Sequence, residues 1–322
     1  MSTGSDRTLR FWDVATGSAI STIPEAHGSL IWDLALSDEG NQLISSSSDA
    51  AVRMWDIASA TPLGQPRRSP HDKDILSIAI SPDGEYVVSS GEDRRLSLWN
   101  AQPQALSWEK SRAHLAPIQS VAFSPTDSKF VSASNDGTLK FWETTTGKLL
   151  GTTQPNVSEK SSIYEVYAVA FHPDGAVVVS GDRAGKMYLW DVNTQEQMGE
   201  PWQAHEKRIL AVAFSPDGRY VASASGDDTV AIWDTDTKAL KYRLAHDKDV
   251  WTVAFSPDGQ HRASGSGYRS LKLWYVETGA AVRTLRGHTN DIASVAFSSD
   301  GGKLASASFD RTIRLWDTRD VA

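Results

Sequence analysis

The feature that most constrains the fold is a tryptophan that returns along the whole chain of 322 residues at nearly constant spacing. Successive members are separated by 41 to 48 residues, and in five cases aspartate follows at once. A supersecondary unit repeated at such a period cannot bury its apolar surface alone and must pack on its neighbours. The repeating residues are Trp12, Trp55, Trp99, Trp142, Trp190, Trp233, Trp274 and Trp316.

Three other polar residues keep fixed distances from this tryptophan. Histidine stands 28 residues before it at His27, His71, His114, His205, His246 and His288. Serine stands ten before it at Ser45, Ser89, Ser132, Ser180, Ser223, Ser264 and Ser306, and aspartate six before it at Asp49, Asp93, Asp136, Asp227 and Asp310. The length varies only between one tryptophan and the next histidine, as expected for rigid units joined by surface loops.

Each unit has the local pattern of antiparallel strands. An aliphatic run such as IQSVAFS follows the histidine, and a turn such as Ser81–Gly84 precedes a second β-rich run and the tryptophan segment. Proline, aspartate and glycine supply the backbone angles of such a turn. Short β-branched runs with no helical period between them predict an all-β fold. Seven inner strands are expected, starting near Ile31, Ile75, Ile118, Val166, Ile209, Val250 and Ile292.

These spacings closely resemble the WD-repeat (WD40) family over essentially the entire chain. The resemblance implies a seven-bladed β-propeller of four-stranded antiparallel blades, closed into a ring by the N-terminal strand. We expect one domain over residues 1–322, with closing strands in 1–24 and blades from about 28, 72, 115, 163, 206, 247 and 289.

Histidine, serine and aspartate in fixed register also suggest a hydrolase. The set recurs five times, however, whereas one catalytic triad is enough, and WD-repeat proteins use this tetrad to tie each blade together. We therefore predict a structural role and no enzymatic activity. The complete tetrads are His27, Ser45, Asp49, Trp55; His71, Ser89, Asp93, Trp99; His114, Ser132, Asp136, Trp142; His205, Ser223, Asp227, Trp233; and His288, Ser306, Asp310, Trp316.

Two repeats depart from the pattern. The fourth has Ser162 and Ala184 in place of histidine and aspartate, a joint loss that fits a coupled network. The sixth keeps His246 but has Tyr268 in place of aspartate, so that blade should be weaker or use a water.

The strands exceed by one the number that seven full blades need. We predict that Ser18–Pro24 supplies the outer strand of the last blade, and that Trp316 rather than Trp12 completes its tetrad, because a short hairpin joins Trp316 to Ser306. Leu9–Asp13 would then lie outside the ring, as a fifth strand or as the contact of a weak dimer; otherwise the protein is a monomer.

Function is expected where the repeats differ. Three positions vary freely: three and five residues after the histidine, and one before the aspartate. In WD-repeat proteins such positions resemble contact points around the mouth of the central channel, here called the rim. The rim residues most suited to holding a partner are Trp32, Leu76, Tyr167, Arg208, Leu210, Trp251 and Phe309. Alternatively, some of these rings pack on one another over the channel.

Composition excludes several classes of function. The chain has no cysteine, so it has no disulfide, zinc-thiolate site or thiol nucleophile. Its net charge of -8 argues against nucleic acid as a partner, and no apolar run is long enough to span a bilayer. We expect a cytoplasmic protein, without excluding the nucleus, that needs no cofactor or metal.

Three classes of function are compatible with the sequence. The first is a non-catalytic scaffold that binds a peptide or protein on the rim. The second is the sensor array of a larger signalling ATPase, since the regular repeats resemble the tandem WD arrays of NACHT-type proteins. The third is a propeller enzyme in which Asp74, Asp249 and Asp291 hold a hard cation.

Overall fold

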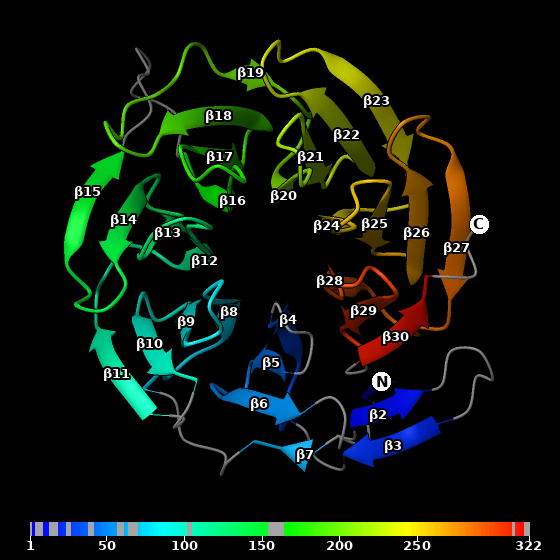
Figure 1. Ribbon diagram of the computed structural model, residues 1–322, viewed down its shortest axis with the longest axis horizontal. Coiled ribbons are helices and arrows are strands. Elements are labelled where there is room, and N and C mark those ends of the chain that lie inside the picture. The colour runs from blue at the N-terminus through cyan, green and yellow to red at the C-terminus, as the bar shows by residue number, and fades with distance from the viewer. Residues whose placement is uncertain are drawn as a thin grey trace.

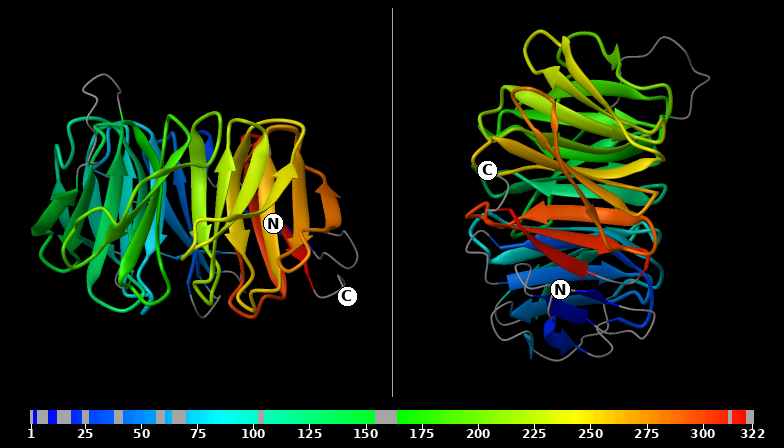
Figure 2. Two further views of the ribbon diagram at one scale, coloured as in Figure 1. Left: turned by 90° about the horizontal axis from the view of Figure 1, so that it is seen from above. Right: turned by 90° about the vertical axis from the view of Figure 1, so that its right-hand side faces the viewer.

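The computed structural model describes residues 2–3, 9–12, 19–23, 27–37, 42–56, 61–63, 70–101, 105–153, 164–310 and 313–318. Every regular element in these ranges is a β-strand. The strands form antiparallel sheets that stand around a central axis like the blades of a propeller (Figure 1). Seen from the side, the strands run between the two faces of a disc (Figure 2).

Six sheets in the described ranges have four strands each, as predicted, with the strands ordered from the axis outward. Blades one to three are β4 (Ile31–Leu36), β5 (Gln42–Ser47), β6 (Val52–Asp56), β7 (Thr61–Pro62); β8 (Ile75–Ile80), β9 (Tyr86–Gly91), β10 (Leu96–Asn100), β11 (Ala105–Lys110); and β12 (Ile118–Phe123), β13 (Lys129–Ser134), β14 (Leu139–Glu143), β15 (Leu149–Thr153). Blades four to six are β16 (Val166–Phe171), β17 (Val177–Asp182), β18 (Lys186–Asp191), β19 (Trp202–Gln203); β20 (Ile209–Phe214), β21 (Tyr220–Ser225), β22 (Thr229–Asp234), β23 (Leu240–Ala245); and β24 (Val250–Phe255), β25 (His261–Ser266), β26 (Ser270–Tyr275), β27 (Ala281–Arg286).

The seventh blade is where the ring closes. Its own strands are β28 (Ile292–Phe297), β29 (Lys303–Ser308) and β30 (Ile313–Asp317), and β28 packs against β4 of blade one. The N-terminal strands β1 (Ser2–Thr3), β2 (Leu9–Trp12) and β3 (Ala19–Ile23) form a separate sheet whose β2 lies against β30 (Figure 1). The N-terminal segment therefore completes the last blade, as predicted.

The order of the closing strands differs from the prediction. Ser18–Pro24 was expected to pair with the last tryptophan strand, but β3 pairs with β2, with Leu9 opposite Ile23. Strand β2 is not left outside the ring; it lies between β30 and β3 (Figure 1). Because the connection between β2 and β3 is short, closing their hairpin costs little conformational entropy. The two strands therefore pack against β30 as one hairpin.

The apolar core lies between neighbouring blades. Between blades one and two, for example, Ile44 and Met54 pack against Ile75, Val87 and Trp99. Each blade buries one set of apolar side chains against the preceding blade and another set against the following blade. Its stability therefore depends on both neighbours.

One core position carries a buried cation. Arg262 on β25 is 0% exposed, at the position where the other six repeats have Leu43, Val87, Phe130, Val178, Val221 and Leu304. Its Nη2 donates to the Tyr275 carbonyl at 3.2 Å, whereas Nε and Nη1 have no hydrogen-bond partner in the described residues. Burial lowers the pKa of Arg262 to about 10. Blade six thus contains a charge that its core does not neutralise.

Each inner strand begins with an irregularity that matters for the site. In β4, Ile31 pairs with Ser47 and Asp33 with Ser46, so Trp32 is an extra residue with no partner in the ladder. The same bulge occurs once in every inner strand, and the extra residue is always the one five positions after the histidine site. The extra residues are Trp32, Leu76, Gln119, Tyr167, Leu210, Trp251 and Ala293. A β-bulge turns its side chain away from the regular alternation of the strand.

Among the described residues there is no helix with the length and apolarity needed to cross a membrane.

Candidate binding site at the channel mouth

The tetrads form buried ties within the blades. In blade three the Trp142 indole donates to Ser132 Oγ at 2.8 Å, and Ser132 Oγ lies 2.7 Å from His114 Nε2. His114 Nδ1 in turn lies 2.9 Å from Asp136 Oδ2. Because the Asp136 carboxylate can only accept, His114 Nδ1 carries the proton and donates to it. The Ser132 hydroxyl then donates to His114 Nε2. Because Ser132 is 0% exposed, its hydroxyl serves the fold and is out of reach of a substrate.

The other four predicted tetrads have the same bonds. Serine Oγ lies 2.7 to 3.0 Å from histidine Nε2 and accepts the tryptophan indole at 2.9 to 3.2 Å. In the last blade Trp316 occupies the tryptophan position, as predicted. Burial alone would raise the pKa of Asp49, but bonds from His27 and from the backbone lower it to about 2. Burial also lowers the pKa of His27, His114 and His288. The imidazoles of these three tetrads are therefore neutral near neutral pH.

The fourth blade replaces the missing tie with another. Ser162 lies outside the described residues, and Ala184 is exposed. Asp182, buried to 1% exposure, accepts the Tyr188 hydroxyl at 3.1 Å and the Lys186 amide at 2.8 Å. Burial is the main cause that raises the pKa of Asp182. Sequence comparison missed this substitute, although aspartate stands here where other repeats have serine or glycine.

The sixth blade has an incomplete tetrad, as the sequence indicated. His246 Nε2 lies 2.7 Å from Ser264 Oγ, which also accepts the Trp274 indole at 2.9 Å. His246 Nδ1 and Ser270 Oγ are buried without a partner in the described residues. Tyr268 is 57% exposed and supplies no substitute for the carboxylate. Burial lowers the pKa of His246 to about 3.

The structure brings six of the seven predicted partner-binding residues around one cavity. It has a volume of about 220 Å³ and lies at the mouth of the central channel, where the inner strands begin. Residues from all seven blades line it, among them Trp32, Leu76, Tyr167, Leu210, Trp251 and Phe309. The seventh, Arg208, lies beside the cavity with its guanidinium 5.8 Å from the centre of the Trp251 ring. Five of the seven are extra residues of the bulges, which direct their side chains to the channel mouth: Trp32, Leu76, Tyr167, Leu210 and Trp251.

Three of the rings pack on one another. Phe309 stands edge-on to Trp32 at 5.0 Å and to Trp251 at 5.5 Å, and we call these three residues the aromatic triad. Each keeps part of its surface exposed. Tyr167 is separate, and its hydroxyl donates to Glu165 at 2.7 Å. The alternative that the rings pack over the channel is thus correct for the triad, which still presents an aromatic surface.

The two tryptophans of the triad differ in their polar partners. The Trp32 indole donates to Ser48 Oγ at 2.7 Å and lies 3.2 Å from Asp74 Oδ2, which accepts the Ser48 hydroxyl at 2.8 Å. These bonds fix Trp32 in its orientation. The Trp251 indole nitrogen has no hydrogen-bond partner in the described residues.

Asp33, which also lines the cavity, was missed by the sequence comparison. Its Oδ1 accepts the Leu34 amide at 2.8 Å and the Ser294 hydroxyl at 3.0 Å, and its Oδ2 accepts the Ser77 hydroxyl and the Ile78 amide, both at 3.1 Å. It therefore joins blade one to blades two and seven. Burial raises the pKa of Asp33 despite these bonds. The signal was present at the sixth position after the histidine, where the other repeats have Ser77, Ser120, Ala168, Ala211, Thr252 and Ser294.

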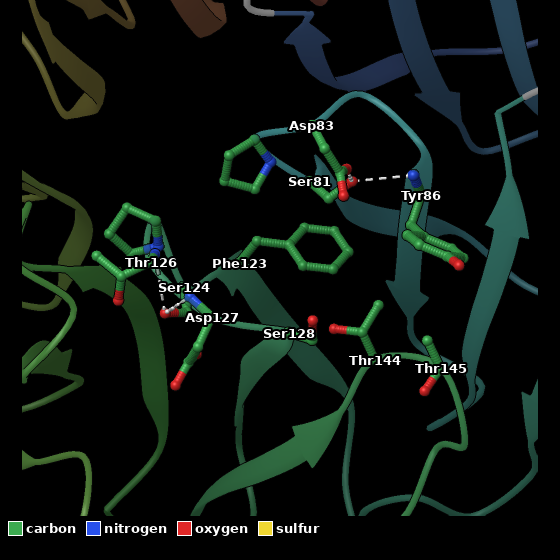
Figure 3. Close-up of a pocket in the computed structure, with 12 residues that line it drawn as sticks. Ser81, Asp83, Tyr86, Phe123, Ser124, Thr126, Asp127, Ser128, Thr144 and Thr145 are labelled. Atoms are coloured by element: carbon green, nitrogen blue, oxygen red, sulfur yellow. Dashed lines mark hydrogen bonds between the residues drawn. The ribbon is translucent and has the colours of Figure 1, made fainter.

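Other hollows lie at the opposite ends of the strands. One of about 230 Å³ is formed between blades two and three by the turns around Asp83 and Asp127, with Phe123 between them (Figure 3). Its polar groups serve the turns themselves; Ser81 Oγ, for example, accepts the Tyr86 amide at 2.9 Å. A hollow of about 340 Å³ occupies the equivalent place between blades five and six. A groove that recurs with the repeat belongs to the scaffold, whereas the channel mouth occurs once.

The described residues do not support the alternative of a cation site. Nowhere in the described part of the chain do three His, Cys, Asp or Glu side chains gather as metal ligands would. Asp74 is bonded to Trp32 and Ser48, and Asp249 lies 3.5 Å from Arg208. The described residues therefore give no support to a hard cation held by Asp74, Asp249 and Asp291.

Radial four-stranded blades with repeated tetrads define a β-propeller. The family model for the WD domain, G-beta repeat, matches residues 17–56, 64–100, 108–143, 152–191, 197–234, 238–275 and 279–317. The chain belongs to this WD40 family. Strand β2, Leu9–Trp12, lies outside all seven matched segments. No curated protein matches the chain.

Proposed function

We propose that this protein is a non-catalytic scaffold that captures a peptide or protein segment on the rim of the channel mouth. WD40 propellers typically act as protein-interaction scaffolds. The observation that carries the proposal is the aromatic triad, which is partly exposed at a cavity lined by residues of all seven blades. Aromatic residues and arginine are enriched at the energetic centres of protein interfaces.

Charge favours a protein partner over a nucleic acid. The three variable rim positions hold five acids, Asp74, Glu92, Glu165, Asp249 and Asp291. They hold only two arginines, Arg183 and Arg208. A surface of this sign would repel phosphate groups.

The test is affinity capture with mass spectrometry, comparing the wild type with Trp251→Ala. Truncating a central aromatic anchor should cost about 2 kcal/mol or more in binding while leaving the fold intact. Tyr275→Ala is the matched control, because Tyr275 is a 38%-exposed aromatic residue at the opposite end of the strands. Trp233→Ala controls for folding, since losing this buried ring should cost about 3–5 kcal/mol of stability.

The proposal would be wrong if Trp32→Ala and Trp251→Ala leave the affinity for the captured partner unchanged while Tyr275→Ala abolishes it. The binding surface would then lie on the face formed by the turns.

A further inference from the structure

The chemistry of the partner can be read from the rim acids, provided that the proposed function holds. Both rim arginines already have acidic partners: Arg183 Nη1 lies 2.8 Å from Glu165 Oε1, and Arg208 Nη2 lies 3.5 Å from Asp249 Oδ2. Asp74 is held by Ser48 and Trp32. Of the five rim acids, this leaves Glu92, which is exposed, and Asp291, which is half-buried.

Asp291 is the half-buried acid without such a partner. In the described part of the chain, no donor lies within hydrogen-bond or ion-pair distance of its carboxylate, although its carbonyl accepts the Phe309 amide at 2.8 Å. Burial and the charge of Asp249 raise the pKa of Asp291, against the opposing charges of Lys248 and Arg269. A carboxylate in such a place is stabilised by an added cation.

A glycine stands beside this carboxylate. Gly267 occupies the rim position next to Asp291, and a Cβ atom at Gly267 would lie only 3.4 Å from Asp291 Oδ2. The equivalent position in the last blade is filled by Phe309. Gly267 therefore places no side chain against Asp291 Oδ2, although Lys248 Cβ and the Asp249 carbonyl lie within 3.6 Å of the same point.

The aromatic triad is joined to the backbone of Asp291 on the same rim. The Asp291 carbonyl accepts the backbone amide of Phe309, whose ring is the central one of the triad and lies 5.5 Å from the Trp251 ring, centre to centre. An unpaired carboxylate on a rim that also carries partly exposed aromatic rings suits arginine, whose planar guanidinium pairs with carboxylates and packs on ring faces. Lysine would gain only the charge, because its ammonium is more strongly hydrated.

We propose that the partner of the rim is a segment that places an arginine side chain at Asp291, with its guanidinium paired to the carboxylate and packed against the aromatic triad.

The experiment uses two synthetic peptides as probes, acetyl-Leu-Arg-Leu-amide and the same peptide with neutral citrulline in place of arginine. Binding to the full chain is followed by NMR through the indole N–H signal of Trp251. The arginine peptide should bind the wild type at least about tenfold more tightly, as expected for a charge-assisted pair. Asp291→Asn should reduce this preference to near unity. Glu206→Gln, at an exposed acid outside the three rim positions, is the matched control and should keep it.

The outcomes separate this inference from the proposed function. Equal binding of both peptides, no binding of either at millimolar concentration, or a preference that survives Asp291→Asn would overturn the arginine assignment. The rim would still stand as the binding surface if Trp251→Ala abolished partner capture. If Trp251→Ala leaves capture unchanged, the proposed function itself fails.

Discussion

Restoring the missing carboxylate of blade six should stabilise the protein. In the complete blade three, Asp136 accepts the Leu115 amide at 2.8 Å and the Thr138 hydroxyl at 2.6 Å, and it is bonded to His114. Blade six has the corresponding donors, His246 Nδ1 and Ser270 Oγ, buried without partners. The substitution Tyr268→Asp would give both an acceptor.

The expected gain in the free energy of unfolding comes from giving His246 Nδ1 and Ser270 Oγ a hydrogen-bond partner. An unsatisfied buried donor costs about 1–3 kcal/mol, and burying the new carboxylate offsets part of the benefit, so we expect a net gain of about 2 kcal/mol. Unfolding entropy of about 2.1 cal/mol/K per residue over the 322 residues converts this into a rise in Tm of about 3 °C. Little is lost with the tyrosine, which is 57% exposed.

The pH dependence has a definite sign. The tetrad holds the pKa of Asp49 at about 2, below the ordinary carboxyl value of 3.8. A carboxyl with a lowered folded-state pKa adds stability that is present above its unfolded-state pKa and lost as pH falls through the folded-state value. The advantage of Tyr268→Asp should therefore be complete at neutral pH and disappear as the pH falls toward 2.

The assay is thermal unfolding together with native-state hydrogen exchange of the β25 and β26 amides. Tyr268→Ser is the control, because it removes the ring without adding a carboxylate. A Tm for Tyr268→Asp equal to or below that of Tyr268→Ser would refute the reasoning.

Three further predictions concern other departures from the repeat. Replacing Arg262, the buried and only partly bonded cation, with leucine should raise the free energy of unfolding by about 2 kcal/mol, and a lower midpoint in urea would contradict this. Asp33→Asn should lower it by about 2–4 kcal/mol, because an amide cannot accept all four bonds that link blade one to its neighbours; an unchanged midpoint would show that these bonds do not hold the ring. The amides between about Val166 and Trp190 should exchange faster than those of blades one to three, since blade four lacks the histidine tie; equal or greater protection would show that the Asp182–Tyr188 pair compensates fully.

The repeat made the architecture predictable, because strict spacing repeated seven times leaves few alternatives. The rim residues could also be predicted, since comparing repeats separates the constant core from variable positions such as Trp32 and Trp251. The bulges were missed, although one extra residue shifts the two-residue alternation of a strand, so that the buried Ile31 and Leu34 stand three residues apart in β4. The order of β2 and β3 depends on how a hairpin docks on β30, which no local pattern encodes. Asp182 and Tyr188 lie six residues apart and pair only through the fold.

The bulges have a consequence for how such a protein changes over time. Because each extra residue, such as Leu76 or Gln119, has no ladder partner, replacing it leaves strand register and the apolar alternation as they were. The residue type at these seven positions, one on each blade, can therefore change with little effect on the stability of the fold. Selection, or a designer, could alter what the channel mouth recognises through substitutions at these seven sites while every blade keeps its tetrad and its core.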